Sequence, residues 1–145
     1  MGSRLALATL ALMAVTVNAQ MPSSVRQLAE KAGVTAPIAA WCRGEFRAGQ
    51  PGYALAAGGR YLVIEGRGGA VELGAFKDKP DLACYSRDEA LKLHRDIQRS
   101  ETLSGAVAPR FGTAVICGFI DATSAACWQY SPAEKAYVKV GSWTT

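Results

Sequence analysis

The chain has 145 residues, of which half are hydrophobic and 19% are charged, and its formal net charge at pH 7 is +4. This length suits one domain that buries a core of its own. Its basic residues are interleaved with acidic ones, as in residues 87–99, whereas a nucleic-acid-binding protein carries a clustered basic stripe. We therefore expect no nucleic acid among the partners.

The first 19 residues have the pattern of a secretory signal peptide. Arg4 supplies a short basic region, and residues 5–17 form an almost unbroken apolar run. Val17 and Ala19 then place small or apolar side chains at positions −3 and −1 of a cleavage site, so cleavage is predicted after Ala19. A helix that stays in the fold, or an uncleaved anchor, is the alternative interpretation.

The rest of the chain, residues 20–145, is predicted to be a single exported domain. The apolar run is shorter than the roughly 20 residues that a transmembrane helix needs, and no later segment is longer. We therefore expect no transmembrane segment in the mature chain, and a periplasmic or extracellular location.

The mature chain is expected to open with a helix and a first group of strands. Ser24 can cap a helix with one apolar face, and Gly33 is placed to end it. A connection rich in glycine and proline follows, through residue 52. Short strands are then predicted at 53–57, 60–65 and 70–76.

The same order is predicted for the second half. Ser86 and Glu89 form a capping box, which predicts a helix over residues 86–100. Three more strands are expected, at 113–120, 125–131 and 136–143. The predicted fold class is therefore α+β, with mainly antiparallel strands in two three-stranded meanders and with two helices.

Four cysteines are present, an even number that predicts two disulfides in an exported domain. The short loop at 121–123 joins two predicted strands in a register that places Cys117 opposite Cys127, at a distance that a disulfide spans. Cys42 is then left to pair with Cys84. The chain has no C-x-x-C pair and a single histidine, so we expect no metal and no cofactor.

No motif is specific enough to name a reaction, and no catalytic residue is predicted. His94, the single histidine, lies at the border of the apolar stripe of the second predicted helix, among acidic residues. If it worked with a nearby carboxylate as an acid–base pair, the protein would be a small extracytoplasmic hydrolase. A lone histidine in such a place is more often structural, so this is the alternative interpretation.

Binding is a better-supported expectation than catalysis. One face of the second predicted meander carries apolar residues such as Trp128 and Val138, which should be core. The opposite face mixes aromatic and polar side chains, as surfaces that contact sugars or proteins do. Its residues are Gln129, Tyr137, Lys139 and Trp143. The alternative is that a helix covers this face.

Trp41 and Arg43, in the long connection, are a second candidate binding set. The sequence therefore predicts a non-enzymatic binding module whose partner is an extracytoplasmic protein or glycan. An inhibitor of an exported enzyme, presenting the connection around Cys42 as a rigid loop, is a further alternative.

Overall fold

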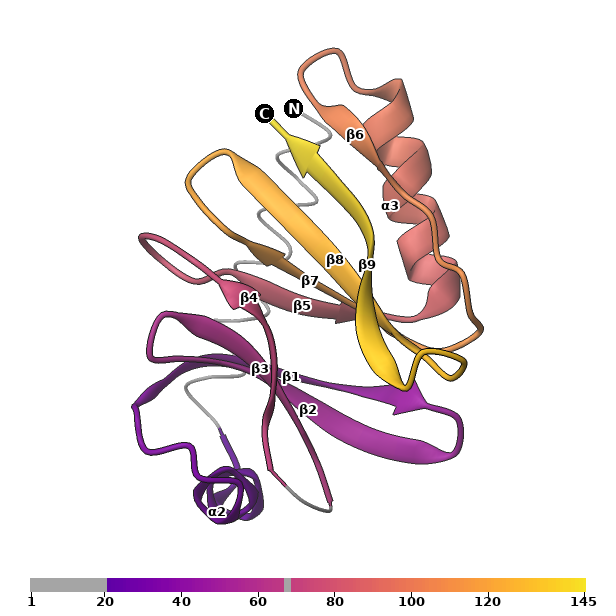
Figure 1. Ribbon diagram of the computed structural model, residues 1–145. Helices are drawn as coiled ribbons and strands as arrows, with labels where there is room; N and C mark the ends of the chain where they lie inside the picture. The colour runs from indigo at the N-terminus through magenta and orange to yellow at the C-terminus, as the bar shows by residue number, and fades with distance from the viewer. Residues whose placement is uncertain (1–20, 67–68) are drawn as a thin grey trace.

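The computed structural model describes residues 21–66 and 69–145 (Figure 1). Two sheets pack face to face, and one helix covers the outer face of each. The four layers are α2 (Ser23–Lys31), a four-stranded sheet, a five-stranded sheet and α3 (Arg87–Arg99). Neither of these two described helices is long and apolar enough to cross a membrane. The predicted signal peptide, residues 1–19, lies outside the described residues.

In the first sheet, the strands lie side by side in chain order, and every neighbouring pair is antiparallel. They are β1 (Ile38–Arg47), β2 (Gln50–Ala57), β3 (Arg60–Glu65) and β4 (Val71–Ala75). The second sheet is also antiparallel and has the order β5-β7-β8-β9-β6, so β6 pairs with the last strand. Its strands are β5 (Leu82–Tyr85), β6 (Ser104–Val107), β7 (Val115–Phe119), β8 (Ser124–Ser131) and β9 (Ala136–Thr144).

The predicted α+β class with antiparallel strands is confirmed. The prediction of two three-stranded meanders is wrong in detail, because the sheets have four and five strands. Strand β1 occupies the stretch whose glycine and proline content predicts a connection. Strands β5 and β6 have four residues each, and neither alternates between buried and exposed positions, so both lack the usual strand pattern.

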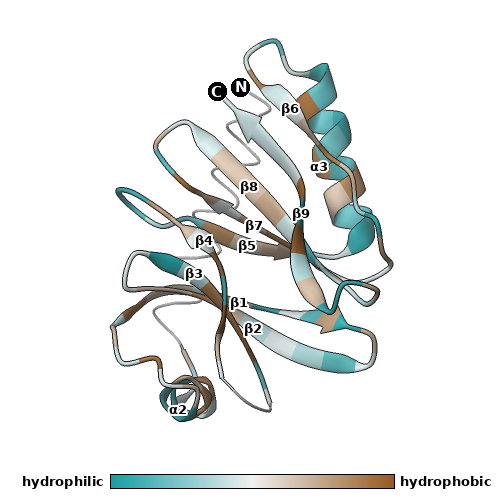
Figure 2. Cartoon of the chain, in the orientation of Figure 1, coloured by the Kyte–Doolittle hydropathy of each residue, from teal (hydrophilic) through white to brown (hydrophobic). Residues whose placement is uncertain are grey.

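One cluster of the core lies between the two sheets and includes large aromatic side chains. Tyr61 of β3 and Trp128 of β8 meet there, with their ring centroids 6.1 Å apart. A second cluster lies between α3 and its sheet, and a third lies beneath α2. In Figure 2, brown, hydrophobic segments run along the inner strands, and teal, hydrophilic turns alternate with brown ones on α3. The second sheet is therefore buried on both faces.

Both predicted disulfides are confirmed. Cys117 and Cys127 are direct neighbours in the register of β7 and β8, with their Cα atoms 4.1 Å apart. Cys42 and Cys84 join β1 to β5, with a Cα separation of 5.7 Å. The first bond lies within one sheet, whereas the second ties the edge of one sheet to the edge of the other. Two disulfides are typical of a protein in an oxidising, extracytoplasmic environment.

Candidate functional site

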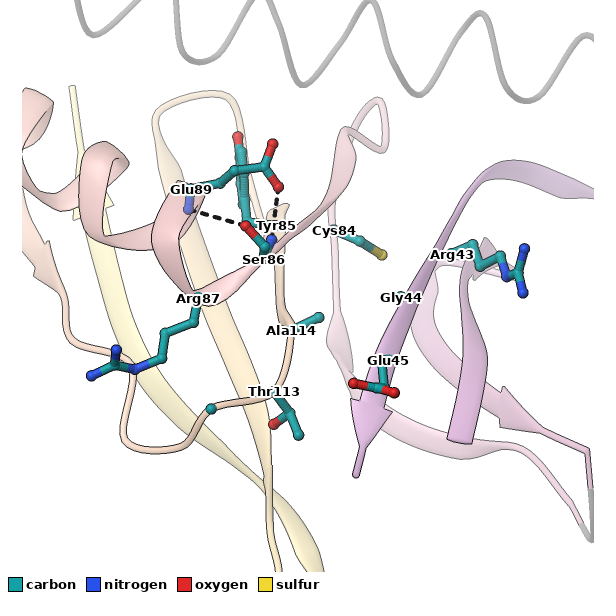
Figure 3. A pocket seen from close by; sticks show the side chains of 11 residues that line it. Arg43, Gly44, Glu45, Cys84, Tyr85, Ser86, Arg87, Glu89, Thr113 and Ala114 are labelled. Carbon is teal, nitrogen blue, oxygen red and sulfur yellow. Dashed lines mark hydrogen bonds between the residues drawn. The ribbon is translucent and has the colours of Figure 1, made fainter. Parts of the chain in front are cut away.

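A pocket of about 310 Å³ opens where the edges of the two sheets meet the N-terminus of α3 (Figure 3). Gly44 of β1, Cys84 of β5 and Ala114, just before β7, line its inner part. The exposed side chains of Arg43 and Arg87 belong to its rim. Three segments that are far apart in the sequence, residues 43–45, 84–89 and 112–114, thus contribute to one concave surface.

Two contacts hold the walls of the pocket together. The Cys42–Cys84 disulfide ties β1 to β5. The backbone N–H of Ala114 donates a 2.9 Å hydrogen bond to the carbonyl oxygen of Glu45. Gly44 makes this approach feasible, because a Cβ at its position would lie 3.1 Å from the methyl group of Ala114 and 2.7 Å from the ring of Phe46. A side chain there would push these walls apart.

The first turn of α3 is already occupied by the protein's own side chains. Ser86 Oγ accepts from the backbone N–H of Glu89 at 3.2 Å, and Glu89 Oε1 accepts from the backbone N–H of Ser86 at 2.8 Å, which is the predicted capping box (Figure 3). In the same view Arg43 and Arg87 point in opposite directions, away from the space between Cys84 and Gly44. The inner part of the pocket is therefore lined mainly by small, uncharged groups.

Residues 108–114 are here called the 108–114 loop; its last three residues, 112–114, line the pocket. Both ends of the loop are fixed by backbone hydrogen bonds. The N–H of Ala108 donates to the carbonyl oxygen of Val140 at 3.0 Å, and the N–H of Ala114 donates to that of Glu45. The first bond ties the loop to the five-stranded sheet, and the second ties it to the four-stranded one.

Gln129 of β8 holds the middle of the 108–114 loop. Its side chain is buried, with 0% exposure, and its Oε1 accepts from the backbone N–H groups of Arg110 and Phe111, at 2.8 and 3.3 Å. Its Nε2 donates to the carbonyl oxygens of Phe111 and Thr113, at 3.1 and 2.8 Å. One buried amide thus satisfies four backbone groups of a surface loop, which fixes the loop in one conformation.

The loop presents a cation and an aromatic ring next to the pocket. Arg110 is exposed and Phe111 is half-buried, and the guanidinium carbon of Arg110 lies 5.5 Å from the centroid of the Phe111 ring. Gly112 and Thr113, the next residues, already line the pocket. The loop and the pocket therefore form one continuous surface.

No protein-family model, curated protein or solved structure matches this chain. What points to a function is the arrangement of its own residues.

Two of the residues predicted to form an exposed binding face are buried. Trp143 is 1% exposed and packs edge-on against Phe119, with their ring centroids 6.0 Å apart. Gln129 is fully buried beneath the 108–114 loop. The expectation that Gln129 and Trp143 are exposed was wrong. Helix α3 covers Trp143, as in the alternative interpretation, and the 108–114 loop covers Gln129.

Tyr137 and Lys139 do not share a face with Trp143. A bulge between β8 and β9 shifts the pairing, so that Tyr130 lies opposite Tyr137 and Gln129 lies opposite Val138. Tyr137 therefore faces the other sheet, and its hydroxyl donates a 3.1 Å hydrogen bond to Glu65 Oε2. Lys139 is exposed. The assignment of Val138 to the same face as Trp128 was wrong for the same reason, whereas Trp128, 7% exposed, is core as predicted.

Trp41 and Arg43 also point to different places. Trp41 packs in the cluster beneath α2, with its ring 5.9 Å from that of Tyr53. Arg43 is exposed at the rim of the pocket. Of the six predicted binding residues, only Arg43 lines the pocket, and Gln129 contributes indirectly through the loop.

His94 makes a structural contact. Its Nδ1 accepts a 3.1 Å hydrogen bond from the backbone N–H of Val107, in β6. It does not line the pocket described above. Within residues 21–66 and 69–145, no three histidine, cysteine, aspartate or glutamate side chains come together in a way that could hold a metal ion. The hydrolase alternative therefore gains no support from the position of His94.

The hold of Gln129 on the 108–114 loop has only a weak signal in the sequence. Gln129 is a large polar residue within a strand whose neighbours are Cys127, Trp128 and Tyr130. A polar side chain in such a run needs hydrogen-bond partners if it is buried. The sequence does not say that those partners are in a loop 16 to 19 residues earlier.

Proposed function

We propose that this protein is an exported, non-enzymatic binding module that recognises a partner protein through the 108–114 loop and the adjoining pocket. The observation that carries this proposal is the set of four hydrogen bonds by which buried Gln129 fixes the loop. A loop that is ordered before binding loses little conformational entropy when it binds, which raises affinity.

The residues on the loop suit a protein partner. Arginine and aromatic residues are enriched at the centres of protein interfaces, where single side chains supply much of the binding energy. Arg110 extends into solvent beside Phe111, and the pocket next to them can accept a side chain of the partner. We expect the partner to offer an acidic group to Arg110 and an apolar surface to Phe111.

The two disulfides support the location that this proposal requires. They are typical of proteins folded in an oxidising compartment. Together with the predicted signal peptide at residues 1–19, they favour a periplasmic or extracellular protein whose partner is found in the same compartment.

The test compares an arginine on the 108–114 loop, Arg110, with an arginine on α2, Arg26. Immobilised wild-type protein, Arg110→Ala and Arg26→Ala are used in parallel to capture proteins from an extracytoplasmic extract, and the dissociation constant of a captured protein is then measured for each. Arg26 is exposed on α2 and does not line the pocket, so it is the matched control.

We expect Arg26→Ala to bind like wild type and Arg110→Ala to lose about 2 kcal/mol of binding free energy, which is about thirtyfold in affinity. Phe111→Ala should behave like Arg110→Ala. Equal binding by Arg110→Ala and wild type would contradict the proposal. Capture of a glycan instead of a protein, unaffected by either loop variant, would also contradict it.

A further inference from the structure

The two disulfides lie in different surroundings. Cys117 and Cys127 are each 0% exposed, inside the cluster between α3 and its sheet. Cys42 is 6% exposed, and Cys84 is half-buried and lines the pocket. A thiol in solution can therefore approach one disulfide without unfolding of the protein, but not the other.

The sulfur of Cys84 has small neighbours on the side of the pocket. In Figure 3 it points from β5 toward β1, where Gly44 has no side chain, and the methyl group of Ala114 points into the same space. The pocket of about 310 Å³ is large enough to admit a small thiol. Access to the sulfur is one of the main determinants of the rate of thiol–disulfide exchange.

The charges at the rim do not repel a thiolate. Arg43 and Arg87 line the pocket together with two acidic residues, Glu45 and Glu89. One of these carboxylates, that of Glu89, accepts a hydrogen bond in the capping box. The residues that line the pocket therefore carry as many positive as negative charges, and α3 begins with its N-terminus three residues after Cys84.

We propose that Cys42–Cys84 is an exchangeable disulfide, reached by a dithiol through the pocket, whereas Cys117–Cys127 is a structural one. A thiolate of the dithiol attacks Sγ of Cys84, the S–S bond breaks, and Cys42 leaves as a thiolate that takes up a proton. The second thiol of the dithiol then resolves the mixed disulfide. The dithiol is oxidised to a disulfide, and Cys42 and Cys84 are reduced to two thiols.

Reduction removes the covalent tie between the sheets at the pocket. Of the two disulfides, Cys42–Cys84 is the one that joins the sheets, and the hydrogen bond from Ala114 to Glu45 spans the same boundary. The core between the sheets is intact after reduction, so the fold persists while β1 and β5 are free to move apart. This proposal does not depend on the binding function of the loop.

The experiment uses dithiothreitol as the dithiol. The native, oxidised protein is treated with it for increasing times, free thiols are blocked with iodoacetamide, and each cysteine is quantified by peptide mapping. We expect Cys42 and Cys84 to be labelled at least about tenfold faster than Cys117 and Cys127, because access controls the rate. Near-ultraviolet circular dichroism should change little during this first phase. Labelling of all four cysteines at one rate, or of Cys117 and Cys127 first, would overturn the proposal.

A variant and a second measurement distinguish access through the pocket from access by unfolding. Ala114→Leu extends a side chain into the pocket and should slow the labelling of Cys42 and Cys84 several-fold, without changing that of Cys117 and Cys127. On the wild-type protein, the rate at Cys42 and Cys84 should be the same with and without a low, non-denaturing concentration of urea, because no opening that exposes new surface is needed. A rate that rises steeply with urea would mean that the protein must unfold first, and would refute the proposal even if Ala114→Leu did not fold.

Discussion

The hydroxyl of Tyr61, in the first sheet, donates a 2.6 Å hydrogen bond to the carbonyl oxygen of Phe119, in the second. The ring passes directly over Gly118, where a Cβ would lie 2.7 Å from it. The same hydroxyl accepts from the backbone N–H of Asp81 at 3.2 Å. A single side chain thus links the inner faces of both sheets through polar groups as well as through packing.

Tyr61→Phe should lower the free energy of unfolding by about 1–2 kcal/mol, because it leaves buried backbone groups of Phe119 and Asp81 without their partner. Urea denaturation measures this loss. The matched control is Tyr53→Phe, since Tyr53 is half-buried on the outer face of the first sheet. Equal effects of the two substitutions would mean that the hydrogen bonds of Tyr61 contribute nothing to stability.

Trp143→Ala should destabilise the protein by about 3–5 kcal/mol, because it leaves a large cavity in the cluster beneath α3. Trp41→Ala should have a smaller effect, since Trp41 is half-buried at the edge of the α2 cluster. Chemical denaturation of both variants gives the comparison. A Trp143→Ala protein as stable as wild type would show that the face beneath α3 is open, contrary to the packing described above.

Gln129→Leu should release the 108–114 loop and lower stability by about 2–4 kcal/mol, because four backbone groups lose their buried partner. Trypsin provides a direct measurement, since it cleaves after arginine. The native wild-type protein should resist cleavage after Arg110, and Gln129→Leu should be cut there.

Gln98→Leu is the control for this prediction. Gln98 is exposed on α3 and donates a 2.8 Å hydrogen bond to the carbonyl oxygen of Gly105, outside the loop. Its loss should leave Arg110 protected. Rapid cleavage after Arg110 in wild type would argue that Gln129 does not fix the loop.

Asp81→Asn should stabilise the protein at pH 7. Burial raises the pKa of Asp81 from its ordinary value of 3.8 to about 6, and no polar partner within the described residues bonds to its buried Oδ1. The folded state therefore holds this proton more tightly than the unfolded state does. The contribution of Asp81 to the free energy of unfolding is therefore most favourable below pH 4, and this contribution is lost as the pH rises through about 6.

Asp81→Asn should raise the free energy of unfolding at pH 7 by on the order of 1 kcal/mol more than it does at pH 4. The effect is no larger because solvent screens part of it at a half-buried site. Urea denaturation at both pH values gives the number. Asp121→Asn is a control of opposite sign, since hydrogen bonds from the backbone of Thr123 and Ser124 lower the pKa of the Asp121 carboxyl. An Asp81→Asn protein with the pH dependence of wild type would contradict the assignment.

Protein recovered from outside the cytoplasm should begin at Gln20, with or without cyclisation to pyroglutamate. The reason is the cleavage pattern at residues 17–19. Intact-mass spectrometry and N-terminal peptide mapping measure it. Recovery of chains that still begin at Met1 would count against cleavage at this site.

Local signals predicted the helices and the disulfides well. The capping box of Ser86 and Glu89 starts α3 where expected, and the short loop at 121–123 sets the register that pairs Cys117 with Cys127. The start of α2 was less accurate, since its N-cap is Pro22 instead of Ser24. In each of these cases the residues that decide the structure lie within a few positions of one another.

The candidate site depends on contacts that no local pattern contains. The bulge between β8 and β9 reverses the faces of Tyr137 and Val138, and a bulge adds one residue without an obvious sequence mark. The hydrogen-bond partners of Gln129 lie in a loop that precedes β7 in the sequence. The pocket is lined by residues of β1 and of the start of α3, which are far apart in the chain. Burial on both faces of the second sheet also removes the alternation from which an exposed face would be predicted.

The position of α3 beside β6 has a consequence for self-association. Strand β6 is at the edge of its sheet, and an edge strand offers free backbone groups to the strands of other molecules. Here the N–H of Val107 donates to His94, and the carbonyl oxygen of Gly105 accepts from Gln98, so two side chains of the helix occupy groups that a foreign strand would use. The one histidine of the chain thereby helps to block intermolecular strand pairing, which protects the protein against aggregation at this edge.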